Sequence, residues 1–402
     1  MTEWKTYKIG DLCKISSSKR IFAKEYKDSG IPFYRGKEII EKQKGNKIST
    51  ELYISQERYE EIKTKHGVPK KGDMLLTSVG TLGIPYIVQD EVFYFKDGNL
   101  TWFYNFEGLD SRYLYYWFLS PIGKMNIDSK AIGSTQKALT IETLSKFEIS
   151  LPPLEEQRRI AGILGVIDDK IENNRRINTN LELQAQSLFG NLISNSNLEY
   201  KLIVDIEHLI ETGRRPKGGV ANIANGVPSI GAENIKSLGK YDYSKTKYIT
   251  EEFAESLKKG FIKGYELLIY KDGGKPGYFI PNFSIFGEGF PYEKMALNEH
   301  VFLLDFGDRG YNFFAYFYMQ TEEVMKYLNA QGSKAAIPGI NRNDVESIAI
   351  PTIENKTVKE FCVRVEPIIS AILTNAKESS RLATLRDTLL PKLMNGEINV
   401  AE

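Results

Sequence analysis

Two long stretches of the chain have the apolar spacing that is typical of helices packed along a partner helix. The first covers residues 151–189 and opens with Pro152 and Pro153, which favour a helix start. Its apolar seam advances in alternating steps of four and three residues, the heptad spacing of a coiled coil. The seam positions are Ile160, Leu164, Ile167, Ile171, Asn174, Asn178, Leu181, Ala185 and Leu188. A helix over residues 158–189 would be about 48 Å long, more than a small domain usually contains.

A second stretch of the same kind lies near the end of the sequence. Residues 357–360 (TVKE) have the form of a capping box, in which an N-cap hydroxyl and a carboxylate three residues later satisfy backbone N–H groups. The heptad seam that follows consists of Val358, Phe361, Val365, Ile368, Ile372, Asn375, Ser379, Leu382, Arg386 and Leu389. Pro391 predicts an end or a kink, and Gly396 suits a C-cap. The sequence therefore predicts two long helices, one central and one terminal.

The segments between these helices repeat one order of motifs. Residues 31–39 (IPFYRGKEI) correspond to residues 227–235 (VPSIGAENI), and residues 71–76 (KGDMLL) correspond to residues 263–268 (KGYELL). The second copy of each motif follows the first by about 200 residues, and the second long helix follows the first by a similar number. We therefore predict an α+β fold with a pseudo-two-fold internal repeat, in which two similar α/β globular domains are separated by two long antiparallel helices that form a coiled coil.

The repeat also predicts domain boundaries and a helix register. The expected parts are a first globular domain over 1–150, a central helix over 151–197, a second globular domain over 198–350 and a terminal helix over 351–402. Antiparallel pairing would bring the middles of the two seams together, so Asn174 should lie near Asn375, flanked by Asn178 and Ser379. Polar residues in an apolar seam reduce stability but can specify register.

Composition restricts the class of protein further. The chain is 42% hydrophobic and 12% aromatic, which is enough for packed cores, and no run of about 18 apolar residues predicts a membrane span. Cys13 and Cys362 are the only cysteines and lie far apart, so a reducing cytoplasm is expected. The net charge of +1 neither indicates nor excludes a nucleic-acid partner, because basic residues can still gather on one face.

No arrangement of residues predicts catalysis or a cofactor. Residues 271–276 (KDGGKP) lack the spacing and the Ser or Thr of a phosphate loop, and no strand precedes a G-x-G-x-x-G fingerprint. Residues 61–63 (EIK) have a nuclease-like spacing, but they lie in a charged helical stretch. His66, His208 and His300 stand beside no Cys pair and no nucleophile. We therefore expect a non-catalytic protein that needs neither a cofactor nor a metal.

The two helix sequences resemble those of one known family. Residues 151–164 (LPPLEEQRRIAGIL) lead into IDDKIE, and residues 389–398 read LLPKLMNGEI. Together with the repeat, they are similar over the whole chain to the specificity subunit of type I restriction-modification systems. The resemblance implies that each globular domain is a target-recognition domain that reads one half of a split, asymmetric site in double-stranded DNA. It also implies that the helices hold these domains apart and dock two modification (methyltransferase) subunits, through which restriction and translocation subunits join the complex.

Base edges and phosphates are contacted by Arg, Lys, Asn, Gln, Ser and Thr side chains on loops and helix ends. In the first domain the candidate DNA contacts on such loops are Arg35, Lys37, Ser78, Thr81, Ser134, Thr135, Gln136 and Lys137. In the second domain they are Arg214, Arg215, Lys217, Asn234, Lys236, Lys271, Lys275, Tyr278, Ser333, Lys334, Asn341 and Arg342. The aromatic stretches 112–118 and 312–318 are instead expected in the core.

Three alternatives stay open at the level of sequence. The polar loop residues could be ordinary solvated turn residues, since loops are polar in most proteins. The chain could be a self-contained DNA methyltransferase or nuclease with an unrecognised site. It could also be a coiled-coil adaptor whose globular domains bind peptides.

Overall fold

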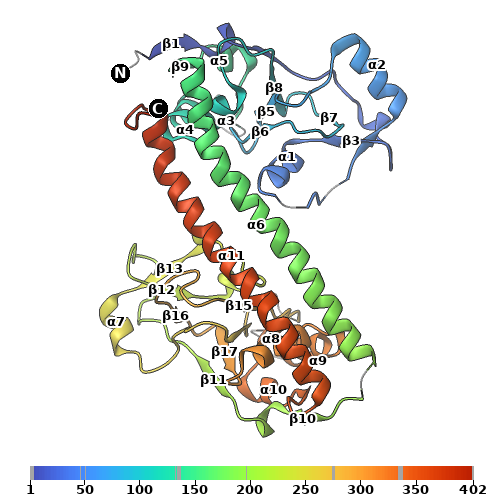
Figure 1. The fold of residues 1–402 in the computed structure, drawn as a ribbon, viewed down its shortest axis with the longest axis vertical. Helices are drawn as coiled ribbons and strands as arrows, with labels where there is room; N and C mark the ends of the chain where they lie inside the picture. Colours follow the sequence, from blue (N-terminus) through green and yellow to red (C-terminus); the bar gives the residue numbers. More distant parts are fainter. Residues whose placement is uncertain are drawn as a thin grey trace. The chain divides into compact units, whose positions relative to one another are not determined.

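The computed structural model describes residues 4–45, 47–49, 51–131, 133, 137–195, 197–273, 277–333 and 338–400. The chain divides into two compact units, one formed by Met1–Asp169 and Leu382–Glu402 and the other by Lys170–Arg381. Each unit contains short strands and helices together with parts of two long helices (Figure 1). Among the described residues, no helix combines the length and apolar character needed to cross a membrane.

The first half of the chain contains three small sheets. Its elements are β1 (Lys5–Lys8), β2 (Lys14–Ser16), β3 (Ile31–Tyr34), α1 (Gly36–Gln43), β4 (Tyr53–Ile54), α2 (Gln56–His66), β5 (Met74–Thr77), β6 (Pro85–Ile87), β7 (Tyr94–Phe95), β8 (Leu100–Tyr104), α3 (Ser111–Leu119), α4 (Pro121–Lys130), α5 (Ile141–Ser145) and β9 (Glu148–Leu151). The main sheet has the order β2-β8-β5-β6, a second sheet has the order β4-β3-β7, and β1 pairs with β9.

The second half repeats this topology strand for strand. Its elements are β10 (Tyr200–Leu202), β11 (Leu209–Thr212), β12 (Val227–Ile230), β13 (Lys247–Ile249), α7 (Glu251–Ser256), β14 (Leu267–Tyr270), β15 (Phe283–Ile285), β16 (Ala296–Leu297), β17 (Val301–Asp305), α8 (Arg309–Tyr318), α9 (Glu322–Gly332), α10 (Arg342–Glu346) and β18 (Ala349–Pro351). The sheet orders are β11-β17-β14-β15, β13-β12-β16 and β10-β18. The predicted α+β class and the internal repeat are therefore confirmed.

Apolar side chains explain why these segments form the core. Strand β5 (MLLT) is buried at every position, and strand β14 (LLIY) is buried at the first three of its four. Helices α3 and α8 carry the aromatic stretches, and most of their rings are buried, as expected. Asp110 and Asp308 cap these two helices through bonds to backbone N–H groups of the first turn.

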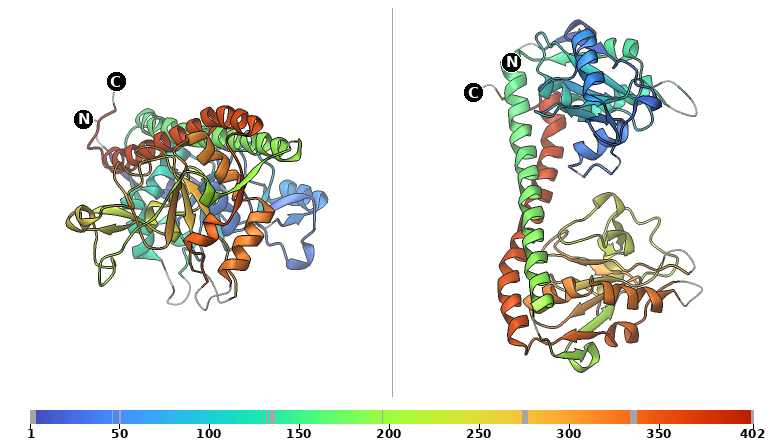
Figure 2. Two further views of the ribbon diagram at one scale, coloured as in Figure 1. Left: turned by 90° about the horizontal axis from the view of Figure 1, so that it is seen from below. Right: turned by 90° about the vertical axis from the view of Figure 1, so that its right-hand side faces the viewer.

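Two long helices, α6 (Leu154–Asn195) and α11 (Lys356–Met394), each take part in both units. In the first unit, Arg386 Nη1 lies 2.8 Å from Asp168 Oδ1. In the second unit, Asn178 Nδ2 donates to the carbonyl of Ile372 at 3.0 Å. Residue numbers rise along one helix as they fall along the other, so the helix segments that lie side by side within each unit are antiparallel (Figures 1 and 2).

One detail of the terminal helix differs from the expectation. Helix α11 continues through Pro391 to Met394, and Gly396 follows with a φ of +76°. A proline lacks the N–H that would bond to the carbonyl four residues earlier, but one such loss in the last turn does not end the helix here. Of the two outcomes expected at Pro391, an end or a kink, the helix end is not observed there. The helix ends at Met394, next to the expected C-cap at Gly396.

Candidate nucleic-acid interface

In each half, several strand ends meet at one edge of the main sheet. In the first half, β8 runs antiparallel to both β2 and β5, with Ser16 opposite Trp102 and Thr77 opposite Leu100. The carboxyl ends of β2 and β5 therefore lie beside the start of β8. Strand β3 runs parallel to β7, and β7 leads directly into the turn at residues 96–99 that precedes β8. We call residues 96–99, and their counterparts at 298–300 in the second half, the central turn.

Backbone hydrogen bonds tie the predicted loops to the central turn of the first half. The N–H of Lys96 donates to the carbonyl of Tyr34 at 2.8 Å, and the N–H of Ser78 donates to the carbonyl of Asn99 at 2.8 Å. The loop after β3 and the loop after β5 are thus held at the same place, although they are far apart in sequence.

The second half is tied together in the same way. The N–H of Asn298 donates to the carbonyl of Ile230 at 2.9 Å, and the N–H of Lys271 donates to the carbonyl of His300 at 3.1 Å. In addition, the N–H of Gly213 donates to the carbonyl of Asn298 at 3.1 Å, which adds the basic segment after β11 to the same edge.

In each half, a β-bridge joins the loop after the main-sheet strand β5 or β14 to the segment before the short helix α5 or α10. Val79 bridges Ala138 in the first half, and Asp272 bridges Gly339 in the second. The N–H of Ile340 also donates to the carbonyl of Lys271 at 2.7 Å. Loops that are distant in sequence therefore form one surface in each half, beside the central turn.

Two candidate side chains, those of Ser78 and Asn234, are buried in this structure. Ser78 is 3% exposed, and its hydroxyl lies 2.6 Å from that of Thr101. Asn234 is 0% exposed, and its Oδ1 accepts from the N–H of Gly231 at 2.9 Å. Their hydrogen-bonding groups hold the loops in shape, so neither side chain faces the surface.

The other candidates of the first half lie at the surface. Arg35 is partly exposed, and its guanidinium is paired with Glu38 at 2.6 Å, which raises the pKa of Arg35 chiefly through that hydrogen bond. The remaining described candidates are exposed, and they are Lys37, Thr81 and Lys137. Ser134, Thr135 and Gln136 lie outside the described residues.

In the second half, candidates gather near the segment after β11 and the loop after β14. The exposed ones are Arg214, Lys217, Lys236 and Tyr278. Lys271 is more enclosed, with its ammonium 4.8 Å from the ring centre of Phe302. Lys275 and Lys334 lie outside the described residues.

Three further candidates have structural partners. Ser333 is partly buried, and its hydroxyl lies 3.5 Å from the Oδ1 of Asn329. Asn341 is the N-cap of α10, where its Oδ1 accepts from the N–H of Asp344 at 3.2 Å. Arg342 is exposed, and its Nε donates to Glu346 Oε1 at 2.8 Å. Burial raises the pKa of Glu346, but bonds from Arg342 and His208 outweigh it and lower that pKa overall.

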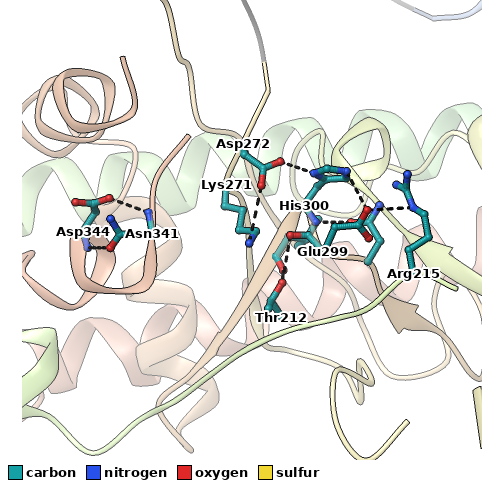
Figure 3. A network of polar contacts seen from close by, with 10 residues as sticks. Thr212, Arg215, Lys271, Asp272, Glu299, His300, Asn341 and Asp344 are labelled. Carbon is teal, nitrogen blue, oxygen red and sulfur yellow. Dashed lines mark hydrogen bonds and ion pairs between the residues drawn. The ribbon is translucent and has the colours of Figure 1, made fainter. Parts of the chain in front are cut away.

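The structure places Asp272, Glu299 and His300, which were not candidate contacts, beside the candidates Lys271 and Arg215. Figure 3 shows a continuous polar network at the central turn of the second half, made of Lys271, Asp272, His300, Glu299 and Arg215. His300 contacts Asp272 through Nδ1 and lies 3.3 Å from Glu299 through Nε2, so it connects the loop after β14 to Arg215. Asn341 and Asp344 stand to one side of this network (Figure 3).

The first half has a related pair that was also missed. Arg20 Nε donates to Asp97 Oδ2 at 2.7 Å, and this bond raises the pKa of the Arg20 guanidinium. The signal in the sequence was the polar turn just before the buried strands LTWFY and VFLLD, which recurs at matching places in the repeat. Among the described residues, no group of three or more His, Cys, Asp and Glu side chains could hold a metal ion.

The four register residues lie together in the second unit. Asn174 Nδ2 donates to Glu378 Oε2 at 2.7 Å and lies 3.3 Å from the hydroxyl of Ser379. Asn375 Nδ2 donates to Asn178 Oδ1 at 2.8 Å. Asn174 and Asn375 are therefore neighbours in the seam, with Asn174 Nδ2 lying 3.5 Å from the carbonyl of Asn375.

Comparison with known proteins shows similarity to specificity subunits of type I restriction enzymes. Residues 1–183 match the type I restriction modification DNA specificity domain. The chain is 25% identical over its full length to the type I restriction enzyme MjaIX specificity subunit of Methanocaldococcus jannaschii, covering 94% of that protein. It is 38% identical over 170 residues to S.HindORF215P of Haemophilus influenzae, which is named as a type I restriction enzyme specificity subunit. That match covers 42% of this chain and 40% of the other.

A solved structure has the same fold. The crystal structure of the type I restriction-modification S subunit from M. genitalium superposes with a TM-score of 0.63 at 16% sequence identity, and the match covers 98% of this chain and 96% of the other. The fold likeness extends over both halves of the repeat, whereas the specificity-domain match covers the first half and part of α6. The chain is thus similar in sequence to type I restriction enzyme specificity subunits, and similar in fold to one solved S subunit.

Proposed function

We propose that this chain is the subunit that reads DNA sequence in a type I restriction-modification complex. Residues 1–150 and 198–350 act as two target-recognition domains, and each reads one part of a bipartite site. The observation that carries this proposal is the repeated sheet edge, where loops of the same origin meet the central turn in each half. Because the side chains at the two edges differ, the site is asymmetric.

The polar surface at each edge suits DNA in its chemistry. Lys37, Lys137, Arg214 and Lys217 are exposed there or in the neighbouring segments, and such residues contact phosphates and guanine edges. Contacts to phosphates release counterions, so affinity should fall steeply as salt is added.

The partners are double-stranded DNA and the subunits that carry out the chemistry. Two modification subunits dock on the chain, and restriction and translocation subunits join through them. Exposed apolar side chains on the long helices, among them Val166 on α6 and Val363 on α11, provide surface that a protein partner can cover. The complex acts on DNA in the cytoplasm.

The test is a selection of duplexes from a random-sequence DNA pool by the purified full-length chain. We expect a recovered consensus with two separated half-sites, and a binding constant whose logarithm falls linearly with the logarithm of salt concentration. A chain that enriches no sequence, or that binds DNA with no dependence on salt, would contradict the proposal and favour the peptide-binding adaptor.

A second measurement separates a reader from an enzyme. The purified chain, free of other subunits, is incubated with labelled S-adenosylmethionine and the selected duplex. We expect no label in the DNA until a modification subunit is added. Methyl transfer by the chain alone would show that it is a self-contained methyltransferase.

A further inference from the structure

Each half of the chain has one arginine held by a carboxylate of the central turn. Arg20 follows β2, and its Nε lies 2.7 Å from Asp97 Oδ2. Arg215 follows β11, and its Nε lies 3.2 Å from Glu299 Oε1. Strands β2 and β11 are equivalent in the repeat, and both carboxylates lie just before the equivalent strands β8 and β17. The two pairs therefore occupy equivalent places in the repeat. Arg20 donates a hydrogen bond to Asp97, whereas Arg215 Nε lies at ion-pair distance from Glu299 without a hydrogen bond.

In both copies the carboxylate takes the Nε side of the guanidinium. Among the residues that the structure describes, the terminal nitrogens of Arg20 and Arg215 donate no hydrogen bond to the protein. The side chain of Arg20 is 67% exposed and that of Arg215 is 28% exposed. The two terminal nitrogens form the planar fork that binds guanine O6 and N7, or a phosphate, in a bidentate manner.

The contribution of these pairs to folding is expected to be modest. The Arg20 side chain is 67% exposed, and the side chains of Arg215 and Glu299 are 28% and 39% exposed, so neither pair is fully removed from water. A carboxylate at an edge that binds DNA also repels phosphates, so it weakens binding unless it has another effect. Holding the guanidinium in one orientation is such an effect, because an ordered side chain loses less conformational entropy when it binds.

We propose that Arg20 and Arg215 are DNA-contacting residues, one for each half-site, and that Asp97 and Glu299 are positioning residues that orient them. This inference rests on the proposed function. In the second half, His300 lies 3.3 Å from Glu299 and also contacts Asp272, so it braces the positioning carboxylate against the loop after β14. In the first half, the central turn has Gly98 beside Asp97 and has no such brace among the described residues.

The first test removes the arginines from the full-length chain. The probe is the duplex that the wild-type chain selects from the random pool. We expect R20Q to weaken binding about ten-fold or more and to reduce the salt slope by about one, with base preference lost in one half-site. R215Q should do the same in the other half-site. R20K keeps the charge but not the fork, so it should lose base preference while the salt slope stays unchanged.

The second test removes the carboxylates. Whether DNA binding becomes tighter or weaker decides between two explanations. If Asp97 and Glu299 only add negative charge, D97N and E299Q will bind every DNA more tightly. If they position the arginines, these variants will bind the selected duplex several-fold more weakly, while binding to an unrelated duplex stays equal or rises. D97N should have no additional effect in the R20Q background, because the residue acts through Arg20.

Exposed ion pairs elsewhere in each half supply matched controls. Lys71, just before β5, pairs with Asp90, just after β6, at 2.6 Å, at the end of these strands away from the central turn. Lys201, in β10, pairs with Glu354, just after β18, at 3.3 Å. We expect K71Q, D90N, K201Q and E354Q to bind the selected duplex as the wild type does. Thermal unfolding of every variant checks that the fold is retained.

The outcomes separate this inference from the proposed function. If the wild-type chain selects a consensus but R20Q and R215Q bind it unchanged, the inference is wrong and the proposed function stands. Tighter binding of the selected duplex by D97N and E299Q would also overturn the positioning roles. If the wild-type chain selects no consensus, the proposed function itself fails.

Discussion

Two buried polar side chains at equivalent loop ends accept hydrogen bonds from backbone N–H groups. Glu38 Oε2 accepts from the N–H of Arg35 at 2.8 Å, and Asn234 Oδ1 accepts from the N–H of Gly231 at 2.9 Å. The two residues occupy equivalent places after β3 and β12, and both are buried. A carboxylate and an amide can share this task because each supplies one oxygen acceptor to an N–H that water does not reach. Each half therefore keeps its loop in shape with its own cap.

Two glycines at equivalent places in the repeat, Gly30 and Gly226, allow the chain to pass close to a strand carbonyl with a positive φ. Gly30 has a φ of +131°, and a Cβ there would lie 2.4 Å from the carbonyl oxygen of Ile54. Gly226 has a φ of +144°, and a Cβ there would lie 2.1 Å from the carbonyl oxygen of Ile249. We predict that G30A and G226A each lower the free energy of unfolding by about 2 to 4 kcal/mol, because strain and a backbone clash act together.

Gly108 supplies the control for this prediction. It also has a positive φ, +70°, but a Cβ there would meet no atom within 4 Å. G108A should therefore cost only the backbone strain, about 1 kcal/mol. Urea unfolding of the three variants measures the difference, and equal losses in all three would show that the close contacts with the strand carbonyls do not matter.

At the scale of elements, the seam between α6 and α11 has a polar centre. Asn174 is buried, and its Nδ2 has partners on α11, but its Oδ1 is buried without a hydrogen bond. Its main partners have other bonds, since Glu378 also pairs with Lys170 at 3.2 Å and Ser379 donates to the carbonyl of Asn375. Asn174 and Asn375 therefore differ in what their loss would leave unpaired.

This difference predicts opposite effects for two substitutions. N174L removes an unsatisfied buried oxygen and continues the apolar seam, so the melting temperature should stay equal or rise. N375A leaves Asn178 Oδ1 without its donor, so the free energy of unfolding should fall by about 1 to 2 kcal/mol. Thermal unfolding followed by circular dichroism compares them. A larger loss for N174L than for N375A would contradict this account.

At the scale of the whole molecule, each half contains a complete copy of the edge that carries the candidate contacts. The Arg20–Asp97 pair and its surrounding strands belong to the first unit, and the Arg215–Glu299 pair belongs to the second. The hydrogen bonds to each central turn also stay within one unit. If the two halves read DNA as proposed, they do so without sharing a side chain of these pairs.

Exchange of one half tests this independence. Residues 1–150 are replaced by the equivalent domain of another specificity subunit, and the chimera selects duplexes from the same random pool. We expect one half-site to change and the other half-site to stay as it is for the wild-type chain. A change in both half-sites would mean that the two halves read DNA jointly. Retention of both original half-sites would show that residues 1–150 do not read DNA.

Much of the fold could be predicted because it depends on regular local patterns. The heptad seams predicted α6 and α11, and the repeated motifs predicted two halves of the same topology. The candidate site was harder, because a polar residue in a loop can face solvent or cap the backbone. Ser78 and Asn234 belong to the second kind, and only their burial distinguishes them from exposed Thr81 and Arg214.

The sequence by itself determined the α+β class, the internal repeat and the existence of two long helices, since periodicity and repetition are properties of neighbouring residues. The tertiary structure alone decided that Arg20 meets Asp97 and that Arg215 meets Glu299. Those residues are far apart along the chain and come together only because β2 pairs with β8 and β11 pairs with β17. Strand pairing depends on the packing of the whole half, so no local pattern contains it.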